Sequence, residues 1–356
     1  MYSLVVIAFI RNVGVTLALL LPVAVSAQQA SKPVRTVIGF GSCSHQSRSQ
    51  AFWDPILSHK PDYFIFGGDN IYSDTYNMAL QWKKYEQLAA HAGFQKLKQS
   101  SVLLATWDDH DFGLNDSGAE FREKEGSREN FLNFWGVPKK SPRRGNPGVC
   151  VARVVDINGY RLQFILLDTR YFRSPLVKRE QRAEGEGRYA RNRDRAATIL
   201  GTEQWAWLEQ QLRVPADVRL LVSSIQVVPE DHYWECWDLF PLERNRLFKM
   251  IKATKANGVI VLSGDRHMAE LSRHDKAIGY PLYDLTSSGL NMGRGGYWPE
   301  PNRHRIGEQF FENNFGLILI EWQKDPLITL QIRDEKNRVV LQEDIRLSTL
   351  KPGTRK

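Results

Sequence analysis

The sequence lacks the features that define several common classes of protein. It contains only three cysteines, and neither a Cys-x-x-Cys nor a His-Glu-x-x-His spacing occurs, which disfavours a zinc-dependent deaminase or protease. Internal repeats and low-complexity tracts are also missing. The content of 42% hydrophobic and 25% charged residues is that of a folded globular protein. After residue 27, no apolar stretch approaches the length of a membrane-spanning helix.

The three cysteines, Cys43, Cys150 and Cys236, are an odd number, so at least one of them lies outside any intramolecular disulfide. If Cys43 is a metal ligand, Cys150 and Cys236 are left either to pair in an oxidising compartment or to remain buried thiols. The sequence alone does not place their Cα atoms and leaves both alternatives open.

The first 27 residues have the pattern of a signal peptide. Residues 13–25 are almost wholly apolar, Arg11 precedes them, and Val25-Ser26-Ala27 offers the small-x-small pattern of a cleavage site. An uncleaved membrane anchor is the alternative, because residues 2–10 are apolar as well. We predict a signal peptide over residues 1–27 and a periplasmic or secreted protein with no transmembrane segment after cleavage.

The rest of the chain alternates short apolar runs with helical patterns, which indicates an α/β fold with mixed sheets. Runs typical of buried strands cover residues 36–40, 63–66, 102–105, 220–228 and 259–262. Helical spacing is found at 52–60, 78–100, 127–135, 202–212 (with Thr202 as the cap) and 242–256. Asn158-Gly159 between two strand-like segments predicts a hairpin with a type I′ turn. Short strands are expected at 269–271, 282–286, 315–320, 327–333 and 339–347. No linker follows residue 33, so we predict one domain.

The formal net charge is +8, and much of the excess lies between residues 174 and 197. We expect this segment to be a surface loop. Its basic residues are either a solvated surface or a rim that attracts a phosphate group toward a binding site.

Cysteine and acidic residues follow four of the apolar runs directly. Cys43 follows the first run, Asp69 the second, Asp108 and Asp109 the third, and Asp265 the fifth. Because ligands of open α/β proteins bind beyond the carboxyl ends of the strands, we expect these side chains to meet in one crevice. The sequence therefore predicts a metal site.

Asp69 and Tyr72 are three residues apart, and both side chains point the same way if the chain turns helically after the strand. A phenolate, a carboxylate and the Cys43 thiolate together suit Fe(III) better than magnesium. Taken singly, Tyr72 is more typical of a capping aromatic in a loop, and a helix cap is the alternative for Asp69.

Residues 107–116 form the densest polar cluster of the chain. The adjacent carboxylates of Asp108 and Asp109 repel each other unless a cation lies between them. Asn115 offers an amide oxygen of the kind that calcium sites use. His110 is either a further ligand or a general acid that protonates a leaving oxygen, and we favour the general acid.

Asp265 and His267 are alternate residues at the end of a strand, so both side chains reach one site. Arg170 follows another strand in the motif Asp168-Thr169-Arg170. Its guanidinium is a candidate for a bidentate phosphate clamp, with a structural ion pair to Asp168 as the equal alternative.

These motifs, in this order, resemble those of the PhoD-like alkaline phosphatases, a branch of the metallophosphoesterases. The resemblance rests on Gly41-Ser42-Cys43, Gly68-Asp69 with Tyr72, residues 107–116, Asp168-Thr169-Arg170 and Ser263-Gly264-Asp265-Arg266-His267, and covers residues 34–348. It implies a metallophosphoesterase-like four-layer α/β/β/α sandwich of two mixed β-sheets flanked by helices.

The resemblance also implies the ligands and the reaction. Iron, as Fe(3+), would be held by Cys43, Asp69, Tyr72 and His267, and Ca(2+) or another divalent metal by Asp69, Asp108 or Asp109, and Asp265. From the residues themselves, we expect a metal-bound oxygen to attack a phosphomonoester or phosphodiester in line, with His110 assisting the leaving alcohol and Arg170 and Asn115 binding the substrate.

Two alternatives to an alkaline phosphatase remain open at this point: a phospholipase D-like phosphodiesterase, and a non-catalytic metalloprotein that binds phosphate or polyanions. The expected substrate is a small-molecule, lipid or nucleotide phosphate ester, without an obligate nucleic-acid partner. The sequence does not determine the oligomeric state.

Overall fold

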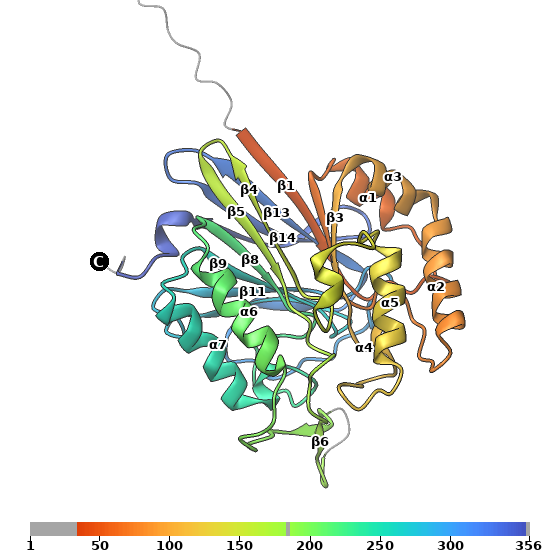
Figure 1. Cartoon of the computed structure of the whole chain (residues 1–356). Helices are drawn as coiled ribbons and strands as arrows, with labels where there is room; N and C mark the ends of the chain where they lie inside the picture. The colour runs from red at the N-terminus through yellow and green to blue at the C-terminus, as the bar shows by residue number, and fades with distance from the viewer. Residues whose placement is uncertain (1–33, 183–185, 354–356) are drawn as a thin grey trace, which may run out of the picture. The chain divides into compact units, whose positions relative to one another are not determined.

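The computed structural model describes residues 34–182 and 186–353. These residues belong to one compact unit, Pro33–Lys356. Two large β-sheets pack against each other, and helices cover their outer faces (Figure 1). The predicted α/β/β/α sandwich of two mixed sheets is confirmed. The predicted signal peptide, residues 1–27, lies outside the described residues.

The first sheet has six strands in the order β15-β14-β13-β1-β2-β3. Their bounds are β1 (Val34–Gly41), β2 (Tyr63–Gly67), β3 (Val102–Thr106), β13 (Asn314–Trp322), β14 (Leu327–Asp334) and β15 (Val339–Arg346). β1, β2 and β3 are parallel, whereas β13, β14 and β15 add antiparallel neighbours along the other edge. The three parallel strands are apolar runs predicted from the sequence.

The second sheet has seven strands in the order β12-β10-β11-β9-β8-β5-β4. Their bounds are β4 (Val151–Ile157), β5 (Tyr160–Leu166), β8 (Val218–Val222), β9 (Val259–Ser263), β10 (Ala269–His274), β11 (Leu282–Ser287) and β12 (Arg305–Phe310). β5, β8, β9 and β11 are parallel. In the β4–β5 hairpin, Asn158 (φ 50°) and Gly159 (φ 82°) both have positive φ, as the predicted type I′ turn requires.

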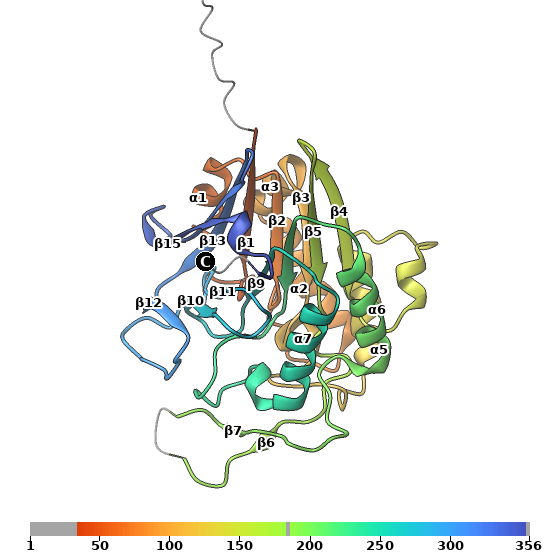
Figure 2. The ribbon, with the colours of Figure 1, turned by 90° about the vertical axis from the view of Figure 1, so that its left-hand side faces the viewer.

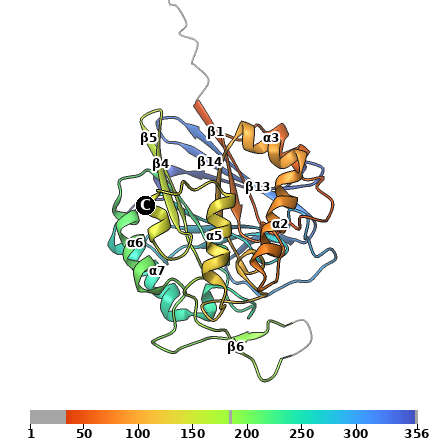
Figure 3. The same ribbon diagram turned by 45° about the vertical axis from the view of Figure 1, so that its right-hand side comes forward.

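The helices form the two outer layers. α1 (Trp53–Ser58), α2 (Met78–Ala90), α3 (Ala92–Ser100) and α5 (Lys124–Phe134) pack on the six-stranded sheet through an aromatic core that includes Phe66, Phe94 and Phe131. α6 (Gly201–Arg213) and α7 (Pro241–Ala253) pack on the seven-stranded sheet through Trp205 and Leu247. Figure 3 shows α6 and α7 on the left and α2 and α3 on the right, with α5 between them in this view.

Several predicted boundaries differ from the structure. The helix expected at 78–100 is broken at His91, where the backbone is extended (ψ 125°) and α3 turns to pack beside α1. The helix expected from Thr202 begins at Gly201, whose N–H donates to the Thr198 hydroxyl at 2.9 Å. The strand expected at 220–228 ends at Val222.

The basic segment 174–197, predicted to be a loop, contains a short hairpin in its described part. β6 (Val177–Lys178) pairs with β7 (Tyr189–Ala190), and Figure 2 shows this hairpin extending beyond α7. Within the ranges described, Cys43, Cys150 and Cys236 are all free thiols, so the alternative of a Cys150–Cys236 disulfide is not realised. None of the helices of the described residues has the length and apolar character needed to cross a membrane.

Candidate metal centre

The parallel strands of the two sheets end at a common rim. The Ser42 N–H after β1 donates to the Ser287 carbonyl at the end of β11, at 3.1 Å. The Thr106 hydroxyl at the end of β3 donates to the Leu167 carbonyl after β5, at 2.6 Å. Residues that follow β1, β2, β3, β5 and β9 are therefore brought together from both sheets. This agrees with the tendency of ligands in open α/β proteins to bind beyond the carboxyl ends of the strands.

The backbone at this rim is strained in a way that few residue types tolerate. Cys43 (φ 58°), Asp69 (φ 50°), Asp265 (φ 73°) and His267 (φ 54°) all adopt the left-handed conformation. Each such residue costs free energy, and residues of this kind cluster where function requires a particular direction of the side chain. Three of these side chains, those of Cys43, Asp69 and His267, place their ligand atoms within 4.8 Å of one another.

Two glycines in the motifs are required by close approach. A Cβ atom on Gly68 (φ 112°) would lie 2.6 Å from the Cβ atom of Asp108, and one on Gly264 would lie 2.4 Å from the Ser42 hydroxyl. Glycine therefore allows the segments after β2 and β9 to approach their neighbours across the rim.

One group of candidate ligands combines a thiol, a carboxyl, a phenol and an imidazole. Ligand atoms of Cys43, Asp69 and His267 all lie within 4.8 Å of one another. The Tyr72 hydroxyl lies 3.2 Å from Asp69 Oδ2 and 3.0 Å from His267 Nε2, and the Cys43 Sγ lies 3.5 Å from Asp69 Oδ2. Asp69 is therefore in contact with two of the other three side chains.

Two further groups of candidate ligands are rich in carboxylates. Ligand atoms of Asp108, Asp109 and Asp265 lie within 4.8 Å of one another, and those of Asp69, Asp109 and His110 do so as well. The groups overlap through Asp69 and Asp109. This is the arrangement expected of a site for two cations with a bridging carboxylate.

The chemistry of these residues fits bound cations. Burial and the neighbouring carboxylates raise the pKa values of Asp69 and Asp265 well above the usual range. Burial, followed by Asp69 as a cause, raises the pKa of the Cys43 thiol, so the anion needs a cation beside it to form. Asp108 Oδ2 and Asp109 Oδ1 are buried without a hydrogen-bond partner among the described residues. These unused oxygen atoms are positioned as ligands.

His267 has the charge state that a metal ligand needs. Burial, and then the Arg266 guanidinium, lower the pKa of His267 to about 3. The imidazole is therefore neutral near pH 7 and keeps a lone pair for coordination.

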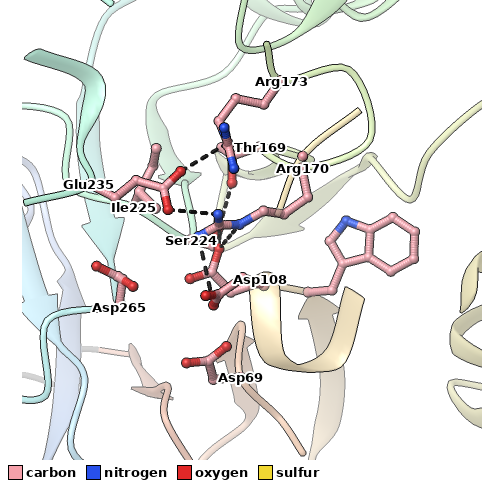
Figure 4. Close-up of polar contacts among 12 residues, drawn as sticks. Asp69, Asp108, Thr169, Arg170, Arg173, Ser224, Ile225, Glu235 and Asp265 are labelled. Atoms are coloured by element: carbon pink, nitrogen blue, oxygen red, sulfur yellow. Dashed lines mark hydrogen bonds and ion pairs between the residues drawn. The ribbon is translucent and has the colours of Figure 1, made fainter. Parts of the chain in front are cut away.

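The position of Arg170 does not fit the prediction that its guanidinium clamps a phosphate. Its side chain has no exposed surface, its Nε donates to Asp108 Oδ1 at 2.6 Å, and its Nη1 donates to Glu235 Oε2 at 2.7 Å. Figure 4 shows Arg170 directed at Asp108, with Glu235 held by both Arg170 and Arg173. The alternative of an ion pair with Asp168 is not found either, because the Asp168 carboxylate accepts from the backbone N–H groups of Val149, Arg170 and Tyr171. In this arrangement Arg170 orients Asp108 from below the site and is not accessible to a substrate.

His110 lies at the open side of the centre. Its Nδ1 is 2.8 Å from Asp74 Oδ1, and its ring packs on Tyr72 with centroids 4.2 Å apart. Burial alone would lower the pKa of His110, but Asp69, Asp109 and Asp74 together raise it to about 11. Since Asp74 occupies Nδ1, Nε2 is the ring nitrogen left to donate a proton.

A cavity of about 140 Å³ opens above the centre. Asp69, Asp109, Asp265 and His267 line it, together with His110 and Asn115. Asn115 is exposed at its edge, where a substrate or a cation can reach the amide. Of the predicted site residues, Cys43, Tyr72, Asp108 and Arg170 do not line this cavity.

Several residues of the site were not predicted from the sequence. Asp74 follows Tyr72 by two residues and could have been considered as a partner of His110. Glu235 and Arg294 lie in segments without regular structure, and no periodic pattern marks them. Both line the cavity of the centre, as does Arg188 of the basic segment 174–197, for which a rim that attracts phosphate was one of the two expectations.

Comparisons with known proteins agree with the motif pattern. Residues 142–295 match the family model described as PhoD-like phosphatase. The chain is 28% identical over 198 residues to alkaline phosphatase D of Bacillus subtilis (strain 168), a match that covers 50% of this chain and 32% of that protein. The matched region thus spans about a third of the length of the curated relative.

Similarity of structure extends further than similarity of sequence. The solved structure of PhoD superposes with a TM-score of 0.70 at 16% identity, covering 91% of this chain and 73% of PhoD. Purple acid phosphatase PPD1 from yellow lupin (Lupinus luteus) superposes with a TM-score of 0.59 at 12% identity, covering 88% of this chain and 54% of the enzyme. At these identities the structures establish a shared fold. Together, the family model and the fold confirm the predicted resemblance of this chain to the PhoD-like phosphatases.

Proposed function

We propose that this chain is an exported, metal-dependent phosphoric ester hydrolase of the alkaline phosphatase D type. The observation that carries the proposal is the overlap of the candidate ligand groups at Asp69. The match to a PhoD-like phosphatase model supports the same reaction class.

The two overlapping groups differ in ligand chemistry. Cys43, Asp69, Tyr72 and His267 would hold Fe(3+), because a thiolate and a phenolate favour a highly charged transition metal. Asp69, Asp108, Asp109 and Asp265 would hold Ca(2+) or another divalent metal, which prefers oxygen ligands. When bound, the two cations would activate water and neutralise charge on the phosphoryl group.

Residues of the chain would supply the proton transfer and the binding of phosphate. His110, oriented by Asp74, would donate a proton to the departing alcohol. Because Arg170 is buried, Arg188 and Arg294, which line the cavity, are better placed to bind the phosphate oxygens, with Asn115 at its edge.

The central test combines turnover, metal content and colour. Purified protein should hydrolyse 4-nitrophenyl phosphate, contain two metal ions per chain by elemental analysis, and show a visible absorption band from tyrosinate on ferric iron. The Tyr72→Phe variant should lose the band while keeping its fold by circular dichroism. Protein without turnover under any metal supplementation would reject the hydrolase assignment.

The choice between monoester and diester is tested with bis(4-nitrophenyl) phosphate beside the monoester. A strong preference for the diester would favour the phosphodiesterase alternative. Metal content and salt-sensitive phosphate binding without hydrolysis would instead favour the non-catalytic alternative. Export is tested by N-terminal sequencing of the mature protein, which should begin at Gln28.

A further inference from the structure

A second, larger cavity adjoins the metal centre. Its volume is about 800 Å³, within the range of pockets that bind small organic molecules. Arg188, Trp234 and Arg294 line both this cavity and the 140 Å³ cavity above the ligands. A molecule with its phosphate at the metal centre therefore has space for the rest of its structure on this side.

The walls of the larger cavity are unusually aromatic. Tyr233, Trp234, Tyr297 and Trp298 contribute four rings. Tyr297 is 78% exposed and Trp298 is 58% exposed, although rings of this size are normally covered in a folded protein. The Trp298 Nε1 donates to the Gly295 carbonyl at 3.1 Å, which holds the indole in place. Exposed rings that are held next to a cavity are typical of surfaces that stack on a ligand.

Positive charge surrounds the ring nearest to the metal centre. The guanidinium groups of Arg188, Arg266 and Arg294 lie 5.4, 5.1 and 5.6 Å from the centre of the Trp234 ring. These cations form a boundary between the two cavities. A ligand that crosses it would place its anionic group on the metal side and an uncharged ring on the aromatic side.

Two buried polar groups on this wall have unused hydrogen-bonding atoms. His232, which is 3% exposed, accepts the Trp234 N–H at Nδ1, so its Nε2 carries the proton, and that atom has no partner among the described residues. Glu300, which is 7% exposed, contacts Arg266 and Arg294 through Oε1, while its Oε2 is unpartnered within the same described part of the chain. The buried part of the cavity wall thus holds one donor and one acceptor that no described residue pairs.

We propose that this cavity binds a planar heteroaromatic ring in the alcohol part of the substrate, as found in a nucleotide. The ring would stack on Tyr297 or Trp298, and its polar edge would meet His232 and Glu300. This inference rests on the proposed phosphoesterase function and specifies the substrate class of that site. The cavity wall has an unpaired donor and an unpaired acceptor beside its aromatic rings. A heteroaromatic ring can pair with both groups, whereas an aliphatic chain would leave both unpaired, so the wall favours the heteroaromatic ring.

The test compares three monoesters with one phosphate each: adenosine 5′-monophosphate, phenyl phosphate and glycerol 3-phosphate. Phosphate release is measured for wild type, Tyr297→Ala, Trp298→Ala and the double variant. Trp82→Ala serves as the control, because Trp82 lies on α2 and lines neither cavity. Removal of a stacking ring should raise KM for the adenosine ester roughly tenfold, which is within the range found for the loss of one base-stacking contact. The KM for the glycerol ester should stay within about twofold of the wild-type value.

Each outcome decides a separate question. Equal changes for all three esters in the ring variants would overturn the proposed subsite. A phenyl ester as good as the adenosine ester would show that the rings act but the His232 and Glu300 edge does not, and would overturn the heteroaromatic assignment. If wild type hydrolyses none of the esters, the proposed function fails. In that case, calorimetry still tests the proposed subsite by comparing the affinities of the protein for adenosine 5′-monophosphate and for inorganic phosphate. Equal affinities would overturn the subsite. Tighter binding of the nucleotide that is lost in Trp298→Ala would support it.

Discussion

The two sides of the site are built in different ways. The rim carboxylates (Asp69, Asp108, Asp109 and Asp265) lie two or three residues beyond the ends of regular strands, and all but Asp265 are at most 2% exposed. The loop aromatics (Trp234, Tyr297 and Trp298) lie in irregular segments, and two of them are largely exposed. Strand ends are fixed by the sheets, whereas loop residues are fixed mainly by their own few contacts.

This difference separates two tasks. Cation binding requires ligand atoms within a few tenths of an ångström, which side chains on a rigid sheet edge provide. Selection of an organic group requires a surface that can vary without disturbing those ligands. We therefore expect substitutions at the rim to change the reaction for every substrate and substitutions in the loops to change the choice of substrate. Four predictions test this comparison, from the largest expected effect to the smallest.

Asp69→Asn should have the largest effect, because this carboxylate belongs to two of the three candidate ligand groups and is the proposed bridge between the cations. The amide loses the charge that holds two cations, so we expect kcat/KM to fall by roughly 10³-fold or more for every ester. Elemental analysis should show that metal content falls with it. Asp54→Asn on the exposed side of α1 is the control. Full metal content and turnover within tenfold of wild type would contradict the bridging position of Asp69.

Arg170→Met should destabilise the fold more than any change in the loops. The variant leaves Asp108 and Glu235 buried without their shared cation, which costs about 3–5 kcal/mol of unfolding free energy. Urea denaturation measures this loss. Arg213→Met removes an exposed pair with Glu209 and should cost less than about 1 kcal/mol. Similar losses in the two variants would mean that the Arg170 ion pairs contribute little to the rim.

His232→Gln should change how stability depends on pH. Burial, and then Arg266, lower the pKa of His232 from 6.5 to about 4. The unfolded state therefore takes up a proton near pH 6.5 while the folded state does not, so stability is lost as the pH falls from 6.5 toward 4. At pH 5 this loss is about 2 kcal/mol. The difference in unfolding free energy between pH 7 and pH 5 should be smaller in the variant by that amount. An unchanged difference would mean that His232 does not stay neutral in its pocket.

Asp74→Asn should have the smallest effect of the four. Asp74 is partly exposed and orients His110 without lining the cavity. We expect a loss of about tenfold in kcat for alkyl esters, whose leaving alcohol needs a proton, and a smaller loss for 4-nitrophenyl esters, whose leaving group does not. Equal losses for both classes of ester would argue that Asp74 supports the fold of the loop and not proton transfer.

The rim carboxylates were largely predictable from the sequence because each of them follows a strand that its own apolar run identifies. Apolar runs identify β1, β2, β3 and β9, parallel strands end on the same side, and the polar residues that follow them must meet. For this reason the positions of Asp69, Asp109 and Asp265 at one crevice follow from pattern alone. The close approach at Gly68 and Gly264 is likewise signalled by glycine in each motif.

The orientation of Arg170 and the aromatic cavity were not predictable in this way. Which carboxylate Arg170 meets depends on how the sheets pack and on Glu235, which is 65 residues away in the chain. The segment around Tyr297 and Trp298 has neither a helical nor an alternating pattern, so nothing in the sequence places it beside the metal centre. β12 was missed for a similar reason, since all six of its residues are at least partly exposed and show no apolar alternation.

The candidate ligands come from both sheets: Cys43, Asp69 and Asp108 from one, and Asp265 and His267 from the other. Any ion that binds there joins the two halves of the sandwich, and its affinity adds directly to the resistance of the chain to heat. Removal of the ions by a chelator should therefore weaken the contact between the two sheets before it affects either sheet alone. The melting temperature of this protein should depend on the ions in its surroundings.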